Sequence, residues 1–154
     1  MKLEIGSTVP DFELSDQDGK PFILKQQLGK KNMVIFFYPK DETPGCTLEA
    51  CTFRDTYEDF KEYDTEIIGI SSDGEESHRN FADRHRLPFT LLSDPNGKVR
   101  ELFGVQRSFL GLLPGRATYI TDKNGKIINI FNSQLDSRKH VEIALDTLKK
   151  FKSN

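Results

Sequence analysis

Short apolar runs alternate with polar turns along the chain, and their lengths and periods predict a succession of strands and helices. Residues 33–38 and 66–71 are apolar almost throughout, which is typical of strands buried on both faces of a sheet. Near the C-terminus Val141, Ala144 and Leu148 recur at helical spacing and predict one apolar helix stripe. The remaining predicted strands are 12–14, 22–24, 89–92, 117–121 and 127–131, and the predicted helices are 47–63, 75–86, 99–103 and 137–150.

The order of these elements indicates the fold class. Turn residues Asp18-Gly19 and Asn124-Gly125 predict two hairpins, one near the N-terminus and one late in the chain. Strands and helices alternate between them, which favours a mostly parallel sheet, with antiparallel strands added at one side. We therefore expect an α/β protein: a thioredoxin-like sandwich with a central mixed β-sheet flanked by helices and an N-terminal β-hairpin extension. Residues 1–154 are expected to form a single domain.

Composition narrows the class of protein. The 154 residues carry 22 basic and 24 acidic side chains, a net charge of −2, so we expect no nucleic-acid partner. The apolar runs are too short to predict a membrane span, and no leader-like segment is apparent. Two cysteines are too few for a disulfide scaffold. These features predict a cytoplasmic protein in a reducing compartment.

The two cysteines, Cys46 and Cys51, are the strongest candidates for chemistry. Thr43 followed by Pro44 fits an N-cap and first helical position, which places Cys46 in the first turn of the helix. Free amide donors and the positive end of the helix dipole lie there, and both favour a thiolate. The thiolate is the nucleophilic form of cysteine.

Helical spacing separates the two sulfurs. Cys46 shares a stripe with Ala50 and Phe53, which predicts that it faces the core, whereas Cys51 shares a mostly acidic stripe and is expected near solvent. Five residues of ideal helix place the two Cα atoms roughly 8.6 Å apart. A disulfide needs about 7 Å or less. Either the pair never forms a disulfide, or the helix start unwinds to form one.

Other roles for the cysteines are less favoured. Inert buried cysteines would not be expected at a helix start and on a polar face. A metal site needs three or four ligands, and the histidines at 78, 85 and 140 are scattered and expected at the surface, so no metal or other cofactor is predicted. The spacing is wider than Cys-x-x-Cys, which argues against a general disulfide oxidoreductase.

The residues around the cysteines resemble a known family. The segment from Pro39 through Thr43 to Cys46 matches the peroxiredoxin signature Pro-x-x-x-Thr-x-x-Cys. Cys51, five residues on, is similar to the bacterioferritin comigratory protein / peroxiredoxin Q subfamily. Leu113-Pro-Gly-Arg116 resembles the stretch that carries its active-site arginine. The resemblance extends over nearly the whole chain.

The resemblance implies an activity and a role for each residue. Cys46 would be the peroxidatic cysteine and Cys51 the resolving cysteine that joins it in an intramolecular disulfide. Thr43 would hydrogen-bond the sulfur and the peroxide, Pro39 would shield the sulfur from water, and Arg116 would hold thiolate and peroxide oxygens. Hydrogen peroxide and alkyl hydroperoxides would be the substrates, thioredoxin the reductant, and the protein a monomer that needs no cofactor.

The chemistry of peroxide reduction gives independent reasons for part of this assignment. Negative charge builds on the leaving oxygen, so a permanent cation with forked donors, such as Arg116, suits the site. Glu49 could pair with Arg116 or Arg54, or could equally be an exposed helix acid. Residues 109–113 are apolar and could form a wall that admits organic hydroperoxides or docks a reductant, or simply pack on the core. A redox sensor using the same switch without turnover is the main alternative.

Overall fold

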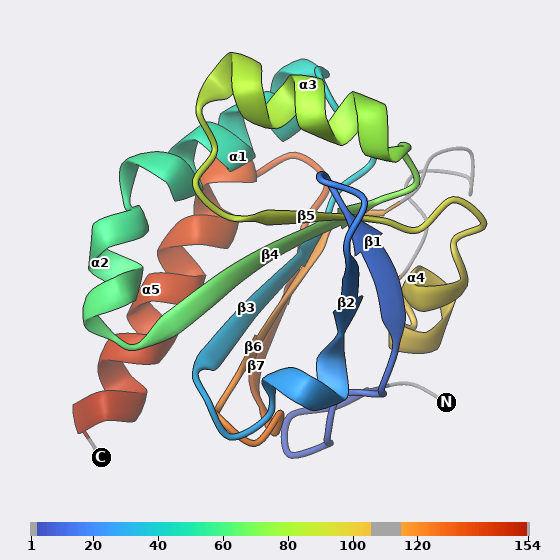
Figure 1. Ribbon diagram of the computed structural model, residues 1–154. Coiled ribbons are helices and arrows are strands. Elements are labelled where there is room, and N and C mark those ends of the chain that lie inside the picture. Colours follow the sequence, from blue (N-terminus) through green and yellow to red (C-terminus); the bar gives the residue numbers. More distant parts are fainter. Residues whose placement is uncertain (1–2, 106–114, 154) are drawn as a thin grey trace.

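The computed structural model describes residues 3–105 and 115–153, and its strands form one seven-stranded sheet in the order β2-β1-β5-β4-β3-β6-β7 (Figure 1). The strands are β1 (Glu13–Asp16), β2 (Pro21–Ile23), β3 (Asn32–Phe37), β4 (Thr65–Ser71), β5 (Thr90–Ser93), β6 (Ala117–Thr121) and β7 (Ile127–Asn132). Only the β3–β4 and β4–β5 pairings are parallel. The sheet is mixed as predicted, but the expectation of a mostly parallel sheet is wrong, because both hairpins join the same sheet at opposite edges.

Helices cover both faces of the sheet (Figure 1). They are the 3-10 helix η1 (Leu24–Gln27) and the α-helices α1 (Pro44–Asp55), α2 (Tyr57–Glu62), α3 (Glu75–His85), α4 (Lys98–Phe103) and α5 (Ser137–Ser153). Helices α1, α2, α3 and α5 contribute to one apolar cluster, and α4 and η1 contribute to a second cluster. In the described chain, no helix combines the length and the apolar character needed to cross a membrane.

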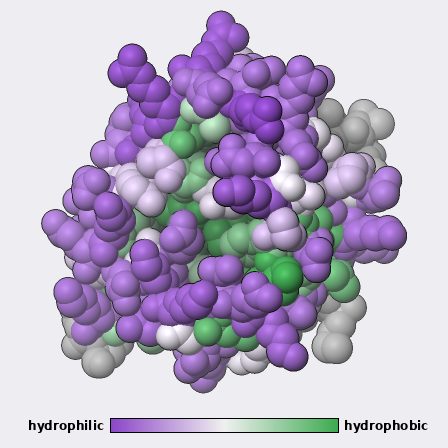
Figure 2. Space-filling view, viewed as in Figure 1, coloured by the Kyte–Doolittle hydropathy of each residue, from purple (hydrophilic) through white to green (hydrophobic). Residues whose placement is uncertain are grey.

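Strand β3 lies between the two clusters. Val34 and Phe36 pack into the cluster with α1, whereas Met33, Ile35 and Phe37 pack into the other, and all five side chains are buried. This alternation confirms the prediction of a strand buried on both faces. Hydrophilic side chains cover most of the face seen in Figure 2, with hydrophobic surface visible between them near its middle.

The predicted helix 47–63 is two helices. It begins earlier, at Pro44, with Thr43 as the N-cap residue that the sequence predicts, and it breaks at Thr56. Thr56 has φ −106° and ψ 11°, and its hydroxyl donates to the carbonyl of Thr52 at 2.8 Å. A threonine hydroxyl that bonds back to the preceding turn favours a local bend, although Thr52 and Thr147 make the same bond inside continuous helices.

Candidate active site around Cys46

Cys46 lies in the first turn of α1, at the point where the chain leaves β3 and enters the helix. Its side chain is 1% exposed and belongs to the apolar cluster under α1, which confirms the predicted inward orientation. The backbone N–H of Thr47 donates to the carbonyl of Thr43 at 2.8 Å and is the first donor of the helical ladder. The amides of Gly45 and Cys46 precede that bond, as is usual at a helix N-terminus.

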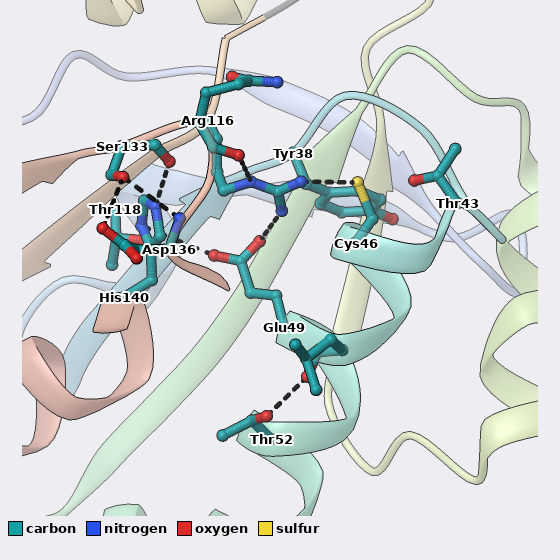
Figure 3. Close-up of polar contacts among 12 residues, drawn as sticks. Tyr38, Thr43, Cys46, Glu49, Thr52, Arg116, Thr118, Ser133, Asp136 and His140 are labelled. Carbon is teal, nitrogen blue, oxygen red and sulfur yellow. Dashed lines mark hydrogen bonds and ion pairs between the residues drawn. The ribbon is translucent and has the colours of Figure 1, made fainter. Parts of the chain in front are cut away.

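Arg116 immediately precedes β6, and its side chain extends to Cys46. Its Nη2 donates to the Cys46 sulfur at 3.3 Å, its Nη1 donates to Oε1 of Glu49 at 2.6 Å, and its Nε donates to the carbonyl of Gln134 at 3.4 Å (Figure 3). Burial lowers the pKa of Arg116, but Glu49 and Cys46 outweigh it and hold the pKa above its ordinary value. The structure thus brings together Arg116 and Cys46, two residues that the sequence analysis selected separately.

Glu49 is a site residue that the sequence analysis left open. It is fully buried, and its ion pair with Arg116 decides among the alternatives considered for it. Burial raises the pKa of Glu49 to about 7, although Arg116 opposes this rise. A signal was available in the sequence, because Glu49 is one helical turn after Cys46 and immediately before Ala50, on the inward side of α1.

His140 lies behind Glu49, and the expectation that it is a surface residue is wrong. Its ring is fully buried, with Nε2 2.7 Å from the carbonyl of Ser133 and Nδ1 2.8 Å from the hydroxyl of Thr118 (Figure 3). Burial lowers the pKa of His140 to about 4, against the bond to Ser133. Because His140 is four residues before the buried Ala144, helical spacing places it on the inward stripe of α5.

His78 was also expected at the surface and is also fully buried. Its Nδ1 lies 2.7 Å from Oδ2 of Asp41, and its Nε2 lies 3.0 Å from the carbonyl of Leu92. The other carboxylate oxygen of Asp41 accepts a 2.6 Å hydrogen bond from Tyr38. His78 precedes the buried Phe81 by three residues on α3, so burial of the whole stripe explains its position.

The contacts of Asp41 anchor the loop that leads into α1. Its backbone N–H donates to Oδ2 of Asp73 at 2.7 Å, and Ser77 donates to its Oδ2 at 2.8 Å. Asp41, Asp73 and His78 have ligand-type atoms within 4.8 Å of one another. These atoms take part in the hydrogen bonds that hold the loop, so the structure supports an anchoring role for the three residues.

Thr43 and Pro39 flank the loop and are both half-buried. The hydroxyl of Thr43 donates to the carbonyl of Lys40 at 2.8 Å and not to the Cys46 sulfur. A hydroxyl that donates in this way keeps its lone pairs as acceptors. The hydroxyl oxygen of Thr43 can therefore still accept a hydrogen bond.

Cys51 lies further along α1, with a half-buried side chain and a free thiol. Burial raises the pKa of the Cys51 thiol, although Arg54 opposes the rise. Helix α1 runs unbroken from Pro44 to Asp55 through both cysteines, so the structure holds the reduced pair. The apolar segment 109–113 lies outside the described residues.

Comparisons with known proteins show which proteins this chain is similar to. Residues 5–130 match the AhpC/TSA family. The chain is 50% identical to the chloroplastic peroxiredoxin Q of Sedum lineare, over 98% of this chain and 81% of that protein. It is 51% identical to the chloroplastic peroxiredoxin Q of Arabidopsis thaliana, over 96% of this chain and 68% of that protein.

Two solved structures have a similar fold over most of this chain. Peroxidoxin BcpB of Mycobacterium tuberculosis superposes with a TM-score of 0.88 at 41% identity, covering 96% of this chain and 97% of that one. The bacterioferritin comigratory protein of Xanthomonas campestris, in a structure described for its alkyl peroxide reduction activity, gives 0.82 at 28% identity and 91% of both chains. These similarities confirm the resemblance in the sequence and the thioredoxin-like fold.

One expectation is contradicted by the same comparisons. The sequence predicts a cytoplasmic protein, whereas the curated relatives that match it at about half identity are named as chloroplastic. These names point to a plastid for the relatives. Charge and composition do not determine where in the cell a protein is located, so the prediction of a cytoplasmic location had no strong physical basis.

Proposed function

This chain belongs to the AhpC/TSA family and is a thiol-dependent peroxidase of the peroxiredoxin Q type, and from that premise we propose that Cys46 is the peroxidatic cysteine. The observation that carries the proposal is the 3.3 Å hydrogen bond from Arg116 to the Cys46 sulfur. A cationic donor at this distance interacts more favourably with a thiolate than with a thiol. It is also placed to stabilise negative charge on a peroxide bound at the sulfur.

In the proposed reaction, the Cys46 thiolate attacks the terminal oxygen of a hydroperoxide. An S–O bond forms, the O–O bond breaks, and the leaving alkoxide or hydroxide takes up a proton to give an alcohol or water. The product on the protein is a Cys46 sulfenic acid. Thr43 would accept the peroxide O–H, since its own proton is held by the carbonyl of Lys40. Pro39 would limit access of water to the sulfur.

Cys51 is the proposed resolving cysteine. Its thiol would condense with the Cys46 sulfenic acid to form an intramolecular disulfide and release water, which requires the start of α1 to unwind. Thioredoxin, or a similar dithiol protein, would then reduce the disulfide. Both cysteines lie in one chain, so we propose that the enzyme works as a monomer of one domain. Hydrogen peroxide and alkyl hydroperoxides are the proposed substrates.

Peroxide consumption in the presence of thioredoxin, thioredoxin reductase and NADPH tests the assignment. Cys46→Ser should abolish consumption, whereas Cys51→Ser should allow one turnover and then accumulate Cys46 sulfenic acid or its further oxidation products. Full activity of Cys46→Ser would reject Cys46 as the peroxidatic residue.

Mass spectrometry of the peroxide-treated protein tests the second step. The loss of two hydrogens from a monomer supports the Cys46–Cys51 bond, and Cys51→Ser should not show that loss. A disulfide-linked dimer of the unmodified protein would contradict intramolecular resolution. If consumption proceeds with a small-molecule thiol but not with thioredoxin, the peroxidase assignment stands and the proposed reductant is wrong.

A further inference from the structure

One oxygen of Glu49 has no hydrogen-bond partner among the described residues. Oε1 accepts from Arg116, whereas Oε2 is buried and accepts no hydrogen bond from them. Leaving a buried ionised oxygen unpaired is costly, so such an atom calls for an explanation. The polar atom that Oε2 faces is Nδ1 of His140, at 3.6 Å (Figure 3).

The contacts of His140 define which of its nitrogens carries a proton. Nε2 lies 2.7 Å from the carbonyl of Ser133, which can only accept, so Nε2 carries a hydrogen. The lowered pKa of His140, about 4, keeps the ring neutral near pH 7. Nδ1 then accepts the hydroxyl proton of Thr118 at 2.8 Å. It has no hydrogen to offer Oε2 of Glu49, which lies 3.6 Å away, so an ionised Oε2 would remain unpaired beside it.

Among the described residues, Arg116 is the cation that contacts both acidic groups of the site. It donates to Glu49 through Nη1 and to Cys46 through Nη2, and all three side chains are at least nine-tenths buried. If Glu49 and Cys46 were both ionised, two negative charges would share this one buried partner. Like charges in such an arrangement disfavour each other's ionisation.

We propose that Glu49 carries a proton on Oε2 whenever Cys46 is a thiolate, so that the carboxyl is neutral beside the charged sulfur. The proton balance is simple: Cys46 gives up a proton, Glu49 gains one, and Arg116 stays protonated. The full charge of Arg116 then acts on the sulfur. Glu49 is a positioning residue in this scheme, acting on Cys46 through Arg116.

Other groups around the pair complete the electrostatic setting. From β6, the hydroxyl of Thr118 lies 2.8 Å from Nδ1 and donates to it. From the segment before α5, Asp136 acts on His140 and favours its charged form, whereas Arg116 disfavours it. The inference rests on the proposed role of Cys46 as the attacking thiolate, but the proton itself can be observed without peroxide.

Infrared difference spectroscopy of the reduced protein, titrated over about pH 5 to 9, tests for the proton directly. A protonated buried carboxylic acid should give a C=O band that Glu49→Gln removes. In Cys46→Ser, which cannot form a thiolate, Glu49 is the sole acidic partner of Arg116 among the described residues. The band should therefore disappear at a pH lower than in the unmodified protein by about one unit or more. Disappearance at the same pH in both proteins would overturn the coupling.

The pH dependence of peroxide consumption gives the second readout. The rate constant of the unmodified enzyme should fall above the pH at which the band disappears, because Glu49 then competes for Arg116. Glu49→Gln, whose amide copies the protonated carboxyl, should not show this fall. Glu142→Gln, at an exposed position of α5, is the matched control and should keep the unmodified profile.

The infrared and kinetic experiments distinguish failure of the positioning role of Glu49 from failure of the proposed function. An identical fall in Glu49→Gln would overturn the positioning role. Absence of peroxide consumption with the predicted infrared behaviour would instead reject the proposed function and leave the proton on Glu49 supported.

Discussion

The buried pair of Glu49 and His140 should give the folded protein opposing pH dependences that nearly cancel. Glu49 has a pKa raised from 4.5 to about 7, so the folded state keeps a proton that the unfolded chain loses, and its contribution to stability falls as pH rises through that window. His140 has a pKa lowered from 6.5 to about 4, so the unfolded chain binds the extra proton, and its contribution is lost as pH falls.

The size of each contribution follows from the two pKa changes. Each spans about 2.5 pKa units, and at 1.36 kcal/mol per unit each is worth about 3 kcal/mol, with opposite sign. Glu49→Gln removes the first contribution. Its free energy of unfolding relative to the unmodified protein should therefore rise by about 3 kcal/mol between pH 4.5 and pH 7. His140→Gln should show the reverse trend between pH 4 and pH 6.5.

Urea unfolding at a series of pH values measures both trends. Differences from the unmodified protein isolate the substituted group, because the titration of all other groups cancels to first order. A pH-independent difference for Glu49→Gln, within about 1 kcal/mol, would refute the reasoning, since it would mean that Glu49 ionises alike in the folded and unfolded states.

Two further substitutions test other parts of the site. Asp41→Ala removes the partner of buried His78 and should lower the free energy of unfolding by about 3–5 kcal/mol in urea, whereas Ala at the exposed Asp146 should change it by less than about 1 kcal/mol. Equal effects would show that the buried pair adds no stability. Gly45→Ala would place a Cβ 3.1 Å from Nη2 of Arg116, so we expect peroxide consumption to slow by about tenfold, with thermal stability kept because alanine favours helix. An unchanged rate would show that Arg116 can shift without loss.

Much of the fold could be predicted from the sequence, because strand and helix periods are local properties. The apolar run of β3 and the Thr43–Pro44 helix start are read directly from neighbouring residues. The sheet order is not local. The two hairpins signal their turns but not the strands they will pair with, which is why the share of parallel strands was overestimated.

The site was predictable only where the chemistry has a local signature. Cys46 stands at a recognisable helix start, and Arg116 follows a family-like stretch, but their 3.3 Å contact depends on β6 pairing with β3. The buried polar residues were harder. His78 was assigned to the surface because its helix is rich in charged residues, and His140 because it lies near the start of the last helix. Their spacing from buried apolar neighbours nevertheless places both on inward stripes.

The anchored loop limits where α1 can open if the proposed disulfide forms. Asp41 is held by Tyr38 and His78 at 2.6 and 2.7 Å, and Glu42, the next residue, is exposed and has a left-handed backbone with φ 63°. On the other side of the cysteines, Phe53 is fixed in the core. Unwinding is therefore confined to the turns between Glu42 and Phe53, and the sheet and the remaining helices can stay in place.

Oxidation itself should favour this opening. The first turn is held by the Thr47–Thr43 backbone bond at 2.8 Å and by the bond from Arg116 to the Cys46 sulfur at 3.3 Å. A thiolate attracts the Arg116 cation, but the proposed sulfenic acid is neutral, so attack on peroxide removes the stronger of the two contacts. Five residues of extended chain reach at most about 17 Å, well beyond the separation a disulfide requires. We therefore expect the Cys46 sulfur to be held by Arg116 as a thiolate and to be released as a sulfenic acid.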